Sequence, residues 1–273
     1  MGQFSSRSGH DVRNTLIDPY EDVPRDVVVT GNDYPSLWRL PAHRHQRGQL
    51  LYPSSGVVTV DTIDGSWVVP PERALWIPPG CSHAVRTAGP VAMRNAFVRA
   101  SAAVASGLPL TCRVLAVSPL LHALLHEAVD LPAHYALDDR DGRVMALLLD
   151  EVARMPALPL STPLPSDRRL LALCRQLLAA PELSLETDAA ALRAGMSRRH
   201  FTRRFREQTG MSYGAWRQHA RLLAALVRLG SGEPVTRVAL ELGYHSSSAF
   251  TAVFRRVLGA PPSRYLALSQ IAR

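Results

Sequence analysis

Arginines at helical spacing are the clearest candidates for binding chemistry in this sequence. Within residues 197–210, Phe201 and Phe205 lie four positions apart and therefore share one face of a helix. The opposite face carries Arg199, Arg203 and Arg206. A helix that is anchored by two aromatic rings and exposes three guanidinium groups on its far side is suited to bind an anion.

The same pattern occurs again 49 residues later, in residues 246–259. The equivalent residues are Ser197 and Ser246, Phe201 and Phe250, Phe205 and Phe254, and Gly210 and Gly259. A serine can accept a hydrogen bond from the free amides of a helix's first turn, and a glycine suits the residue that ends a helix. The repeat therefore predicts two equivalent helices.

The basic residues are distributed unevenly along the chain. Residues 1–165 carry 14 Arg against 16 acidic residues, a net charge of −2, whereas residues 166–273 carry 17 Arg against 7, a net charge of +10. All 31 basic residues are Arg. Coding bias would account for the missing Lys but not for the asymmetry, which predicts a polyanionic partner for the second half.

The cysteine content and the length of the apolar runs limit which classes of protein this sequence can belong to. Cys81, Cys112 and Cys174 are scattered and odd in number, so they do not form a disulfide framework. No apolar run follows a basic start, and none approaches the roughly 20 residues that span a bilayer. We expect a soluble, cytoplasmic protein without a membrane partner.

The elements that must position the arginines are helices. Seven helical patterns follow residue 166, and within them each Phe-Phe helix is preceded by a short helix and a turn containing glycine. Such pairs are typical of the helix-turn-helix, whose second helix enters the major groove of DNA. The helix joining the pairs, residues 213–229, would be about 26 Å long, which can set the two recognition helices about one DNA turn, ~34 Å, apart.

The first half has the texture of β-structure. Residues 1–35 show no periodicity and are interpreted as an irregular arm. Between residues 37 and 98, short apolar runs alternate with Pro and Gly turn signals about every ten residues, which favours a small β-barrel or sandwich.

Two helical patterns and a proline-rich segment follow the predicted barrel. Residues 119–129 and 142–152 have apolar residues at steps of three and four. They form either the seam of a homodimer or a cover for one side of the barrel, and Leu147, next to Leu148 and Leu149, favours an additional intermolecular face. Residues 155–165 contain four prolines and are expected to be extended, which sets a linker at residues 156–166.

Two histidine motifs lie inside the predicted barrel. Residues 41–56 contain His43, His45, Gln49 and Gly56, and residues 78–83 read Pro-Pro-Gly-Cys-Ser-His, ending at His83. This resembles the two motifs of the cupin family, in which three His and a Glu converge on a divalent metal. The resemblance implies a divalent metal at His43, His45 and His83, with neutral Gln49, a weaker ligand, in place of Glu. Sensory members of that fold that have lost the metal bind a small molecule instead, so both occupants stay open.

Residues 167–268 closely resemble the DNA-binding domain of the AraC/XylS family of bacterial transcription regulators. The matching positions include Gly195, Ser197, Phe201, Phe205, Gly210, Gly243, Ser246, Phe250, Phe254, Gly259 and Pro261. By this resemblance the base-contacting residues are Arg199, Thr202 and Arg203 in the first module and Ser247, Ser248, Ala249 and Ala252 in the second. From their places toward the helix ends, we expect phosphate contacts from Arg198, Arg206, Arg255 and Arg256, and such contacts supply affinity without sequence information.

The sequence thus predicts an α+β chain with three parts. A cupin-like sensor and dimerisation domain spans residues 1–155, with its helices at about 119–155. The linker spans 156–166, and an all-α domain with two helix-turn-helix modules spans 167–273. The leading hypothesis is a non-enzymatic, one-component transcription regulator that binds double-stranded DNA under the control of a small-molecule effector. The alternatives are a metal-dependent cupin enzyme with a DNA-binding tail and a sequence-blind architectural binder.

Overall fold

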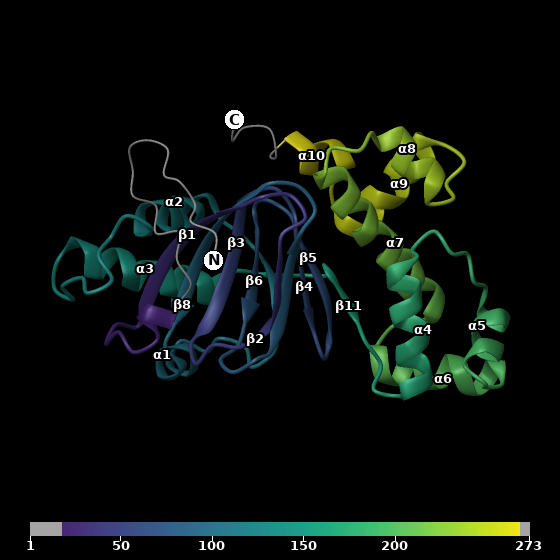
Figure 1. Cartoon of the computed structure of the whole chain (residues 1–273), viewed down its shortest axis with the longest axis horizontal. Helices are drawn as coiled ribbons and strands as arrows, with labels where there is room; N and C mark the ends of the chain where they lie inside the picture. Colours follow the sequence, from purple (N-terminus) through teal and green to yellow (C-terminus); the bar gives the residue numbers. More distant parts are fainter. Residues whose placement is uncertain (1–17, 268–273) are drawn as a thin grey trace.

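The apolar segments of the first half form strands of two antiparallel sheets, which together make the barrel in Figure 1. The structure is a computed structural model that describes residues 18–267. The six-stranded sheet has the order β1 (Val27–Tyr34), β8 (Val91–Val98), β3 (Gly48–Ser55), β6 (Arg73–Ile77), β9 (Arg113–Ala116) and β10 (Ala157–Leu158). The five-stranded sheet has the order β11 (Ser161–Pro163), β5 (Gly65–Val69), β4 (Val58–Thr62), β7 (His83–Thr87) and β2 (Arg39–His43). A short 3-10 helix, Asp18–Tyr20, precedes β1, and α1 (Ala100–Ala105) follows β8.

The β-texture predicted for residues 37–98 is confirmed, but the barrel begins earlier than expected. Strand β1 pairs with β8 along its whole length, so the prediction of an irregular arm is wrong for residues 27–34. The first six residues of β1 are all buried. A strand buried on both faces shows no alternation of apolar and polar residues, and the sequence pattern therefore gave no signal. Residues 1–17 of the predicted arm lie outside the described residues.

Helices α2 (Pro119–Ala128) and α3 (Arg140–Arg154) pack on the six-stranded sheet. Both start at side-chain caps, where Ser118 accepts a hydrogen bond from the amide of Leu121 and Asp139 accepts from the amides of residues 141 and 142. Leu148 and Leu149 are buried, whereas Leu147 is 40% exposed. The role of these helices as a cover for the barrel accounts for their buried faces. The dimer seam stays a prediction.

Between residue 166 and residue 267, where the description ends, the chain forms seven helices, as the sequence predicts. They are α4 (Arg168–Ala179), α5 (Thr187–Arg193), α6 (Arg198–Thr209), α7 (Tyr213–Gly230), α8 (Val235–Glu241), α9 (Ser247–Leu258) and α10 (Pro262–Ala267). We call α5 with α6 module one, and α8 with α9 module two; α7 joins them (Figure 1). Ser197 and Ser246 cap α6 and α9, and Gly210 and Gly259 end these helices with φ of 72° and 83°. Glycine adopts this left-handed conformation without the strain that a Cβ atom brings.

Aromatic rings hold α6 in place. Phe205 is fully buried, and its ring centroid lies 5.6 Å from that of Tyr213 and 5.8 Å from that of Trp216. Phe201 lies 5.7 Å from Phe205 on the same helix face. The equivalent Phe250 and Phe254 of α9 are also fully buried. The four phenylalanines are core residues, as the sequence predicts, and they turn the opposite faces of α6 and α9 outward.

The proline-rich segment is extended, but it does not run free between the two halves. Strand β10 pairs with β9, and β11 pairs with β5, so the segment adds one edge strand to each sheet of the barrel. The indole Nε1 of Trp216 donates a hydrogen bond of 2.8 Å to the carbonyl of Pro163. The segment predicted as a linker therefore belongs to both halves of the chain.

The end of α7 contacts the barrel directly. Gly230 faces Val57, and a Cβ atom at position 230 would lie only 2.2 Å from Cγ2 of Val57. The apolar core of the barrel continues through Val57 and Val91 to Leu229 and Phe254. The side chain of Val57 thus leaves no room for a Cβ atom at position 230, where a glycine stands.

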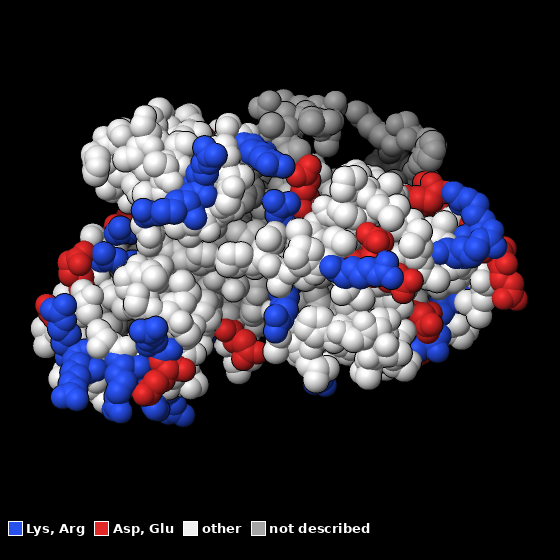
Figure 2. Space-filling model, turned by 180° about the vertical axis from the view of Figure 1, so that it is seen from behind, with Lys and Arg blue, Asp and Glu red and all other residues white. Residues whose placement is uncertain are grey.

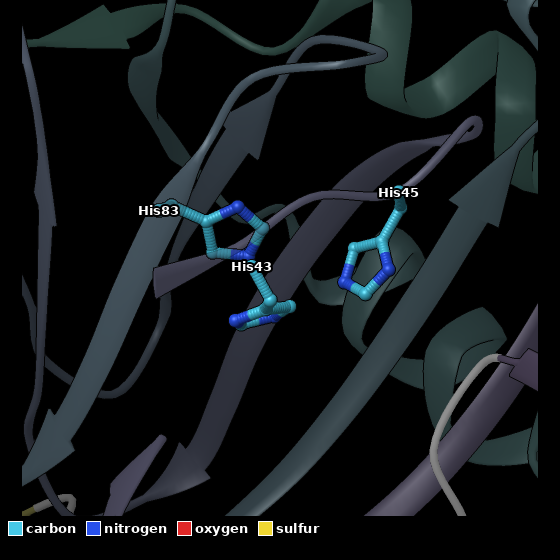
Figure 3. A group of neighbouring side chains, drawn as sticks. All are labelled: His43, His45 and His83. Atoms are coloured by element: carbon cyan, nitrogen blue, oxygen red, sulfur yellow. The ribbon is translucent and has the colours of Figure 1, made fainter. Parts of the chain in front are cut away.

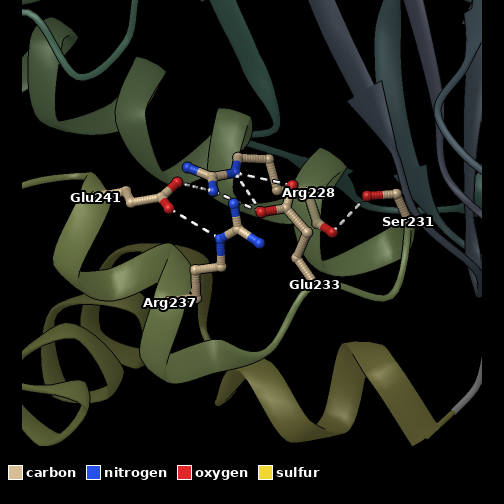
Figure 4. Close-up of polar contacts among 5 residues, drawn as sticks. All are labelled: Arg228, Ser231, Glu233, Arg237 and Glu241. Carbon is tan, nitrogen blue, oxygen red and sulfur yellow. Dashed lines mark hydrogen bonds and ion pairs between the residues drawn. The ribbon is translucent and has the colours of Figure 1, made fainter.

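Ion pairs connect α7 with α8 (Figure 4). Arg228 donates to Glu233 at 2.5 Å and also to Glu241, while Arg237 lies 2.9 Å from Glu241. Arg217 likewise pairs with Glu186 at 2.9 Å. Both arginines, Arg217 and Arg228, therefore take part in contacts between helices.

His219 gives the fold an acid-sensitive contact between α7 and the proline-rich segment. Burial lowers its pKa from the usual 6.5, although hydrogen bonds to the backbone of Pro159 and Ser161 act in the opposite direction. Below pH 6.5 the unfolded chain then binds a proton that the folded chain does not, so stability falls as the pH is lowered. We expect wild type to lose more unfolding free energy between pH 7.5 and 5.5 than His219→Gln, by at most about 1.4 kcal/mol per pH unit. Urea unfolding measures this, and equal losses would contradict it.

Candidate nucleic-acid interface and histidine cluster

The outward face of α6 is basic. Arg199, Arg203 and Arg206 are all exposed, and none forms an ion pair or a side-chain hydrogen bond with another residue of the described range 18–267. Figure 2 shows arginines gathered at the end of the molecule that module one forms. Their guanidinium groups are therefore available to a partner from outside the chain.

Two other predicted contact residues of α6 have partners within the protein. Arg198 forms an exposed ion pair with Asp188 of α5 at 2.8 Å. The hydroxyl of Thr202 donates to the backbone carbonyls of Arg198 and Arg199, at 3.0 and 3.2 Å. The hydroxyl proton of Thr202 is thus used within the helix, and Arg198 shares its charge with a carboxylate.

The outward face of α9 carries short side chains. Ser248 and Ala252 are exposed, while Ser247 and Ala249 are half-buried. Arg255 and Arg256 are exposed near the C-terminal end of the helix. The two modules share one backbone design but differ in chemistry, because α6 offers long cationic side chains where α9 offers hydroxyl and methyl groups.

The three histidines of the barrel motifs lie together in the structure (Figure 3). His43 ends β2 and pairs across the sheet with His83, which begins β7, while His45 lies in the loop after β2. The ring centroids are 4.3 Å apart for His43 and His83, 4.9 Å for His43 and His45, and 5.4 Å for His45 and His83. One ring nitrogen from each lies within 4.8 Å of the others.

Nδ1 of His43 and Nδ1 of His83 each contact a backbone carbonyl, whereas Nδ1 of His45 lies beyond hydrogen-bond distance of its neighbour Glu21. His83 Nδ1 lies 3.0 Å from the carbonyl of Cys81, His43 Nδ1 lies 2.9 Å from that of Pro41, and His45 Nδ1 lies 3.6 Å from a carboxylate oxygen of Glu21. Burial lowers the pKa of His83 and of His45 to about 4, and neighbouring histidines act in the same direction. Neutral rings whose Nδ1–H is donated keep an Nε2 lone pair for a ligand, the arrangement found around bound metals.

Gln49 is tied into a ladder of amide side chains. Its Nε2 donates to Oδ1 of Asn95 at 3.1 Å, and Nδ2 of Asn95 donates to Oδ1 of Asn32 at 3.3 Å. Gln49 Oε1 and His83 Nε2 are both buried and find no hydrogen-bond partner within residues 18–267. Two unpaired acceptor atoms suit a cation or a ligand with hydrogen-bond donors.

A cavity of about 160 Å³ lies beside the cluster and is lined by His43, His45 and Gln49. His83 is not part of its lining but packs against His43. The cavity is small compared with the roughly 300–1,000 Å³ of sites for drug-sized ligands. Sequence reasoning missed its other walls, which are Thr30, Asn32, Tyr34, Trp38, Leu40, Arg44, Leu51, Val85, Met93, Asn95 and Phe97. Asn95, a polar residue within the largely apolar run 91–98, was an available signal.

Comparisons with known proteins agree with both halves of this arrangement. A family model described as the AraC-like ligand binding domain matches residues 27–194, and a helix-turn-helix domain model matches residues 189–267. No helix in the described residues combines the length and the apolar character that crossing a membrane requires.

Relatives of this chain include named regulators. It is 32% identical to the HTH-type transcriptional regulator NimR of Escherichia coli K12 over 230 residues, covering 83% of this chain and 82% of that protein. Over 82 residues it is 38% identical to the regulatory protein SoxS of Salmonella typhimurium, covering 30% of this chain and 77% of that one. Among solved structures, ToxT from Vibrio cholerae aligns over 89% of this chain and 99% of its own length, at 10% identity and a TM-score of 0.38.

Proposed function

The chain belongs to the AraC family of transcription regulators, and on that basis we propose how its parts divide the work. Module one reads the base sequence of a promoter, module two adds affinity, and a ligand beside the histidine cluster of the barrel controls both. The observation that carries the proposal is the exposed face of guanidinium groups on α6. Helix α9 has the same caps and buried phenylalanines, but its outward face carries short side chains instead.

Base contacts in this proposal come from the outward faces of the two helices. They are made by Arg199, Thr202, Arg203, Ser247, Ser248, Ala249 and Ala252. Phosphate contacts come from residues nearer the helix ends, Arg198, Arg206, Arg255 and Arg256. A guanidinium can bind O6 and N7 of a guanine with two hydrogen bonds, whereas a methyl group contacts only thymine's methyl. The unequal side chains of the two modules therefore favour unequal roles.

Selection of bound fragments from genomic DNA tests this function. We expect a small set of enriched promoter fragments that share a motif, with binding that weakens as salt increases because displaced counterions oppose it. If binding depends on salt but the bound fragments share no motif, the regulator hypothesis is wrong and the protein is a sequence-blind architectural binder.

For the barrel we propose a divalent metal ion as the controlling ligand. The donor set fits, since Nδ1 of His43 and Nδ1 of His83 each contact a backbone carbonyl, and one ring nitrogen of each of the three histidines lies within 4.8 Å of the others. Imidazole donors suit zinc and other late transition metals. Such an ion would bring positive charge to the unpaired acceptors, Gln49 Oε1 and His83 Nε2. A compact organic effector with hydrogen-bond donors is the second candidate, favoured by the same two atoms.

An enzymatic role has less support. Among the described residues that line the cavity there is no carboxylate to serve as a general acid or base. The relatives named above are regulators. Stoichiometric metal together with turnover of a small substrate would favour the rival cupin enzyme.

Zinc binding tests the proposed site directly. After treatment with chelator, the full-length protein is expected to bind one Zn²⁺ per chain in equilibrium dialysis. His83→Ala should weaken binding more than about tenfold, because it removes one of three ligands. His200→Ala is the matched control, since His200 is exposed on α6, outside the cluster. If the wild type binds no Zn²⁺, or if both variants lose affinity equally, the metal hypothesis is wrong and the organic effector is the candidate that is left.

A further inference from the structure

Two thiol groups touch at one end of the barrel. Sγ of Cys81 lies 3.7 Å from Sγ of Cys112, although the residues are 31 positions apart in sequence. Cys81 lies in the turn between β6 and β7, and Cys112 directly precedes β9. Strands β6 and β9 are paired antiparallel, with Trp76 opposite Arg113, so both cysteines extend from the same end of this pair. The sheet itself sets the two thiols side by side.

The segments that carry these thiols are held by hydrogen bonds. The amide of Gly80 donates to the carbonyl of His45 at 2.8 Å, and that of Cys81 donates to the carbonyl of Pro78 at 3.2 Å. On the other side, Nε1 of Trp76 donates to the carbonyl of Pro109 at 2.8 Å. The contact between the thiols is therefore set by fixed backbone on both sides.

The thiol pair is reachable from solvent, unlike the remaining cysteine. Cys81 and Cys112 are both partly exposed and line an open cavity of about 580 Å³. Cys174, the third cysteine of the chain, is fully buried in α4, and burial raises its pKa to about 12. A dissolved oxidant can therefore reach the pair and not Cys174.

We propose that Cys81 and Cys112 form a reversible disulfide by exchange with a low-molecular-weight disulfide. The thiolate of one cysteine attacks a sulfur of the small disulfide, forms a mixed disulfide and releases one small thiol, which takes up the proton. The second cysteine then attacks the protein sulfur of the mixed disulfide and releases the other small thiol with its proton. Two protein thiols are oxidised, and one small disulfide is reduced to two thiols.

The geometry requires only a local movement. A disulfide has an S–S length of about 2.05 Å, so the sulfur atoms must approach by about 1.7 Å from their present 3.7 Å. The turn is open beside Gly80: apart from its two chain neighbours, no described residue has a heavy atom within 4 Å of where a Cβ atom of Gly80 would be. The bond would join the β6–β7 turn, whose Cys81 carbonyl holds Nδ1 of His83, to the segment before β9.

Thiol counting after exchange tests the proposal. The reduced, full-length protein is equilibrated with mixtures of reduced and oxidised glutathione, quenched with acid, and alkylated under denaturing conditions. As oxidised glutathione increases, labelled thiols should fall from the three of the chain to one. The intact mass should fall by two hydrogen atoms before labelling, and digestion should yield one peptide pair linked through Cys81 and Cys112.

Three variants make the result specific. Cys174→Ser should form the same disulfide as the wild type, while Cys112→Ser should stop at a glutathione adduct on Cys81. Cys81→Ser should form no bond within the chain. The proposal is overturned if the wild type keeps three thiols across the whole series, accumulates only adducts, forms only bonds between chains, or links Cys174. The peptide map of the wild type is sufficient to show whether Cys81 and Cys112 are linked, so the proposal stays testable even if a variant does not fold.

Discussion

Arg203→Ala is expected to weaken binding to the preferred DNA site while changing binding to unrelated DNA much less. Arg203 is exposed on the face of α6 opposite the buried Phe201 and Phe205, and no described residue pairs with it. A bidentate contact to guanine contributes about 1–3 kcal/mol of discrimination, which corresponds to a change in Kd of about five- to 150-fold. Binding-site selection on the variant should show relaxed preference at one or two positions.

Arg255→Ala is the matched comparison in module two. Arg255 lies near the C-terminal end of α9, where phosphate contact is favoured over base contact. This variant should weaken binding evenly across sequences and reduce the slope of log affinity against log salt by about 1. The assignment of roles fails if Arg255→Ala changes the preferred bases and Arg203→Ala does not.

Phe205→Ala is expected to destabilise module one by about 3–5 kcal/mol, the usual cost of truncating a buried aromatic side chain. Phe205 is fully buried and packs edge-on against Tyr213 and Trp216, which begin α7. Loss of this contact releases α6 from the core, so specific DNA binding should be lost with it. Urea unfolding followed by circular dichroism measures the first effect, and DNA titration measures the second.

A surface substitution provides the control for Phe205→Ala. Leu192 on α5 is 81% exposed, so Leu192→Ala should change stability by no more than about 0.5 kcal/mol. If Phe205→Ala unfolds at the same urea concentration as Leu192→Ala, the aromatic cluster does not hold α6, and our account of module one is wrong.

The helical half could be predicted from the sequence because its signals are local. Serine caps, left-handed glycines and phenylalanines four residues apart each report on one turn of helix, and the repeat supplied a second, independent reading. The convergence of His43, His45 and His83 came instead from the resemblance to a family motif. Spacing alone does not bring residue 83 next to residue 43, which is a matter of how β2 pairs with β7.

The features that the sequence did not predict depend on pairing between distant segments. Strand β1 lacks alternation because both of its faces are buried. The contact of Cys81 with Cys112 and the requirement for glycine at position 230 arise only once the strands, or the two halves of the chain, are assembled. A pattern confined to neighbouring residues carries no information about such contacts.

The proline-rich segment has a consequence for where the sensor can be cut. Strands β10 and β11 occupy the outer edges of the two sheets next to β9 and β5. Unpaired sheet edges offer free backbone amides and carbonyls to any extended chain, and they promote aggregation. A sensor fragment that ends at residue 155 would leave β9 and β5 as open edges, whereas one that ends after Pro163 keeps both covered. The same few residues that lead to the DNA-binding half thus pair with β9 and β5 and replace these longer edges by two short ones.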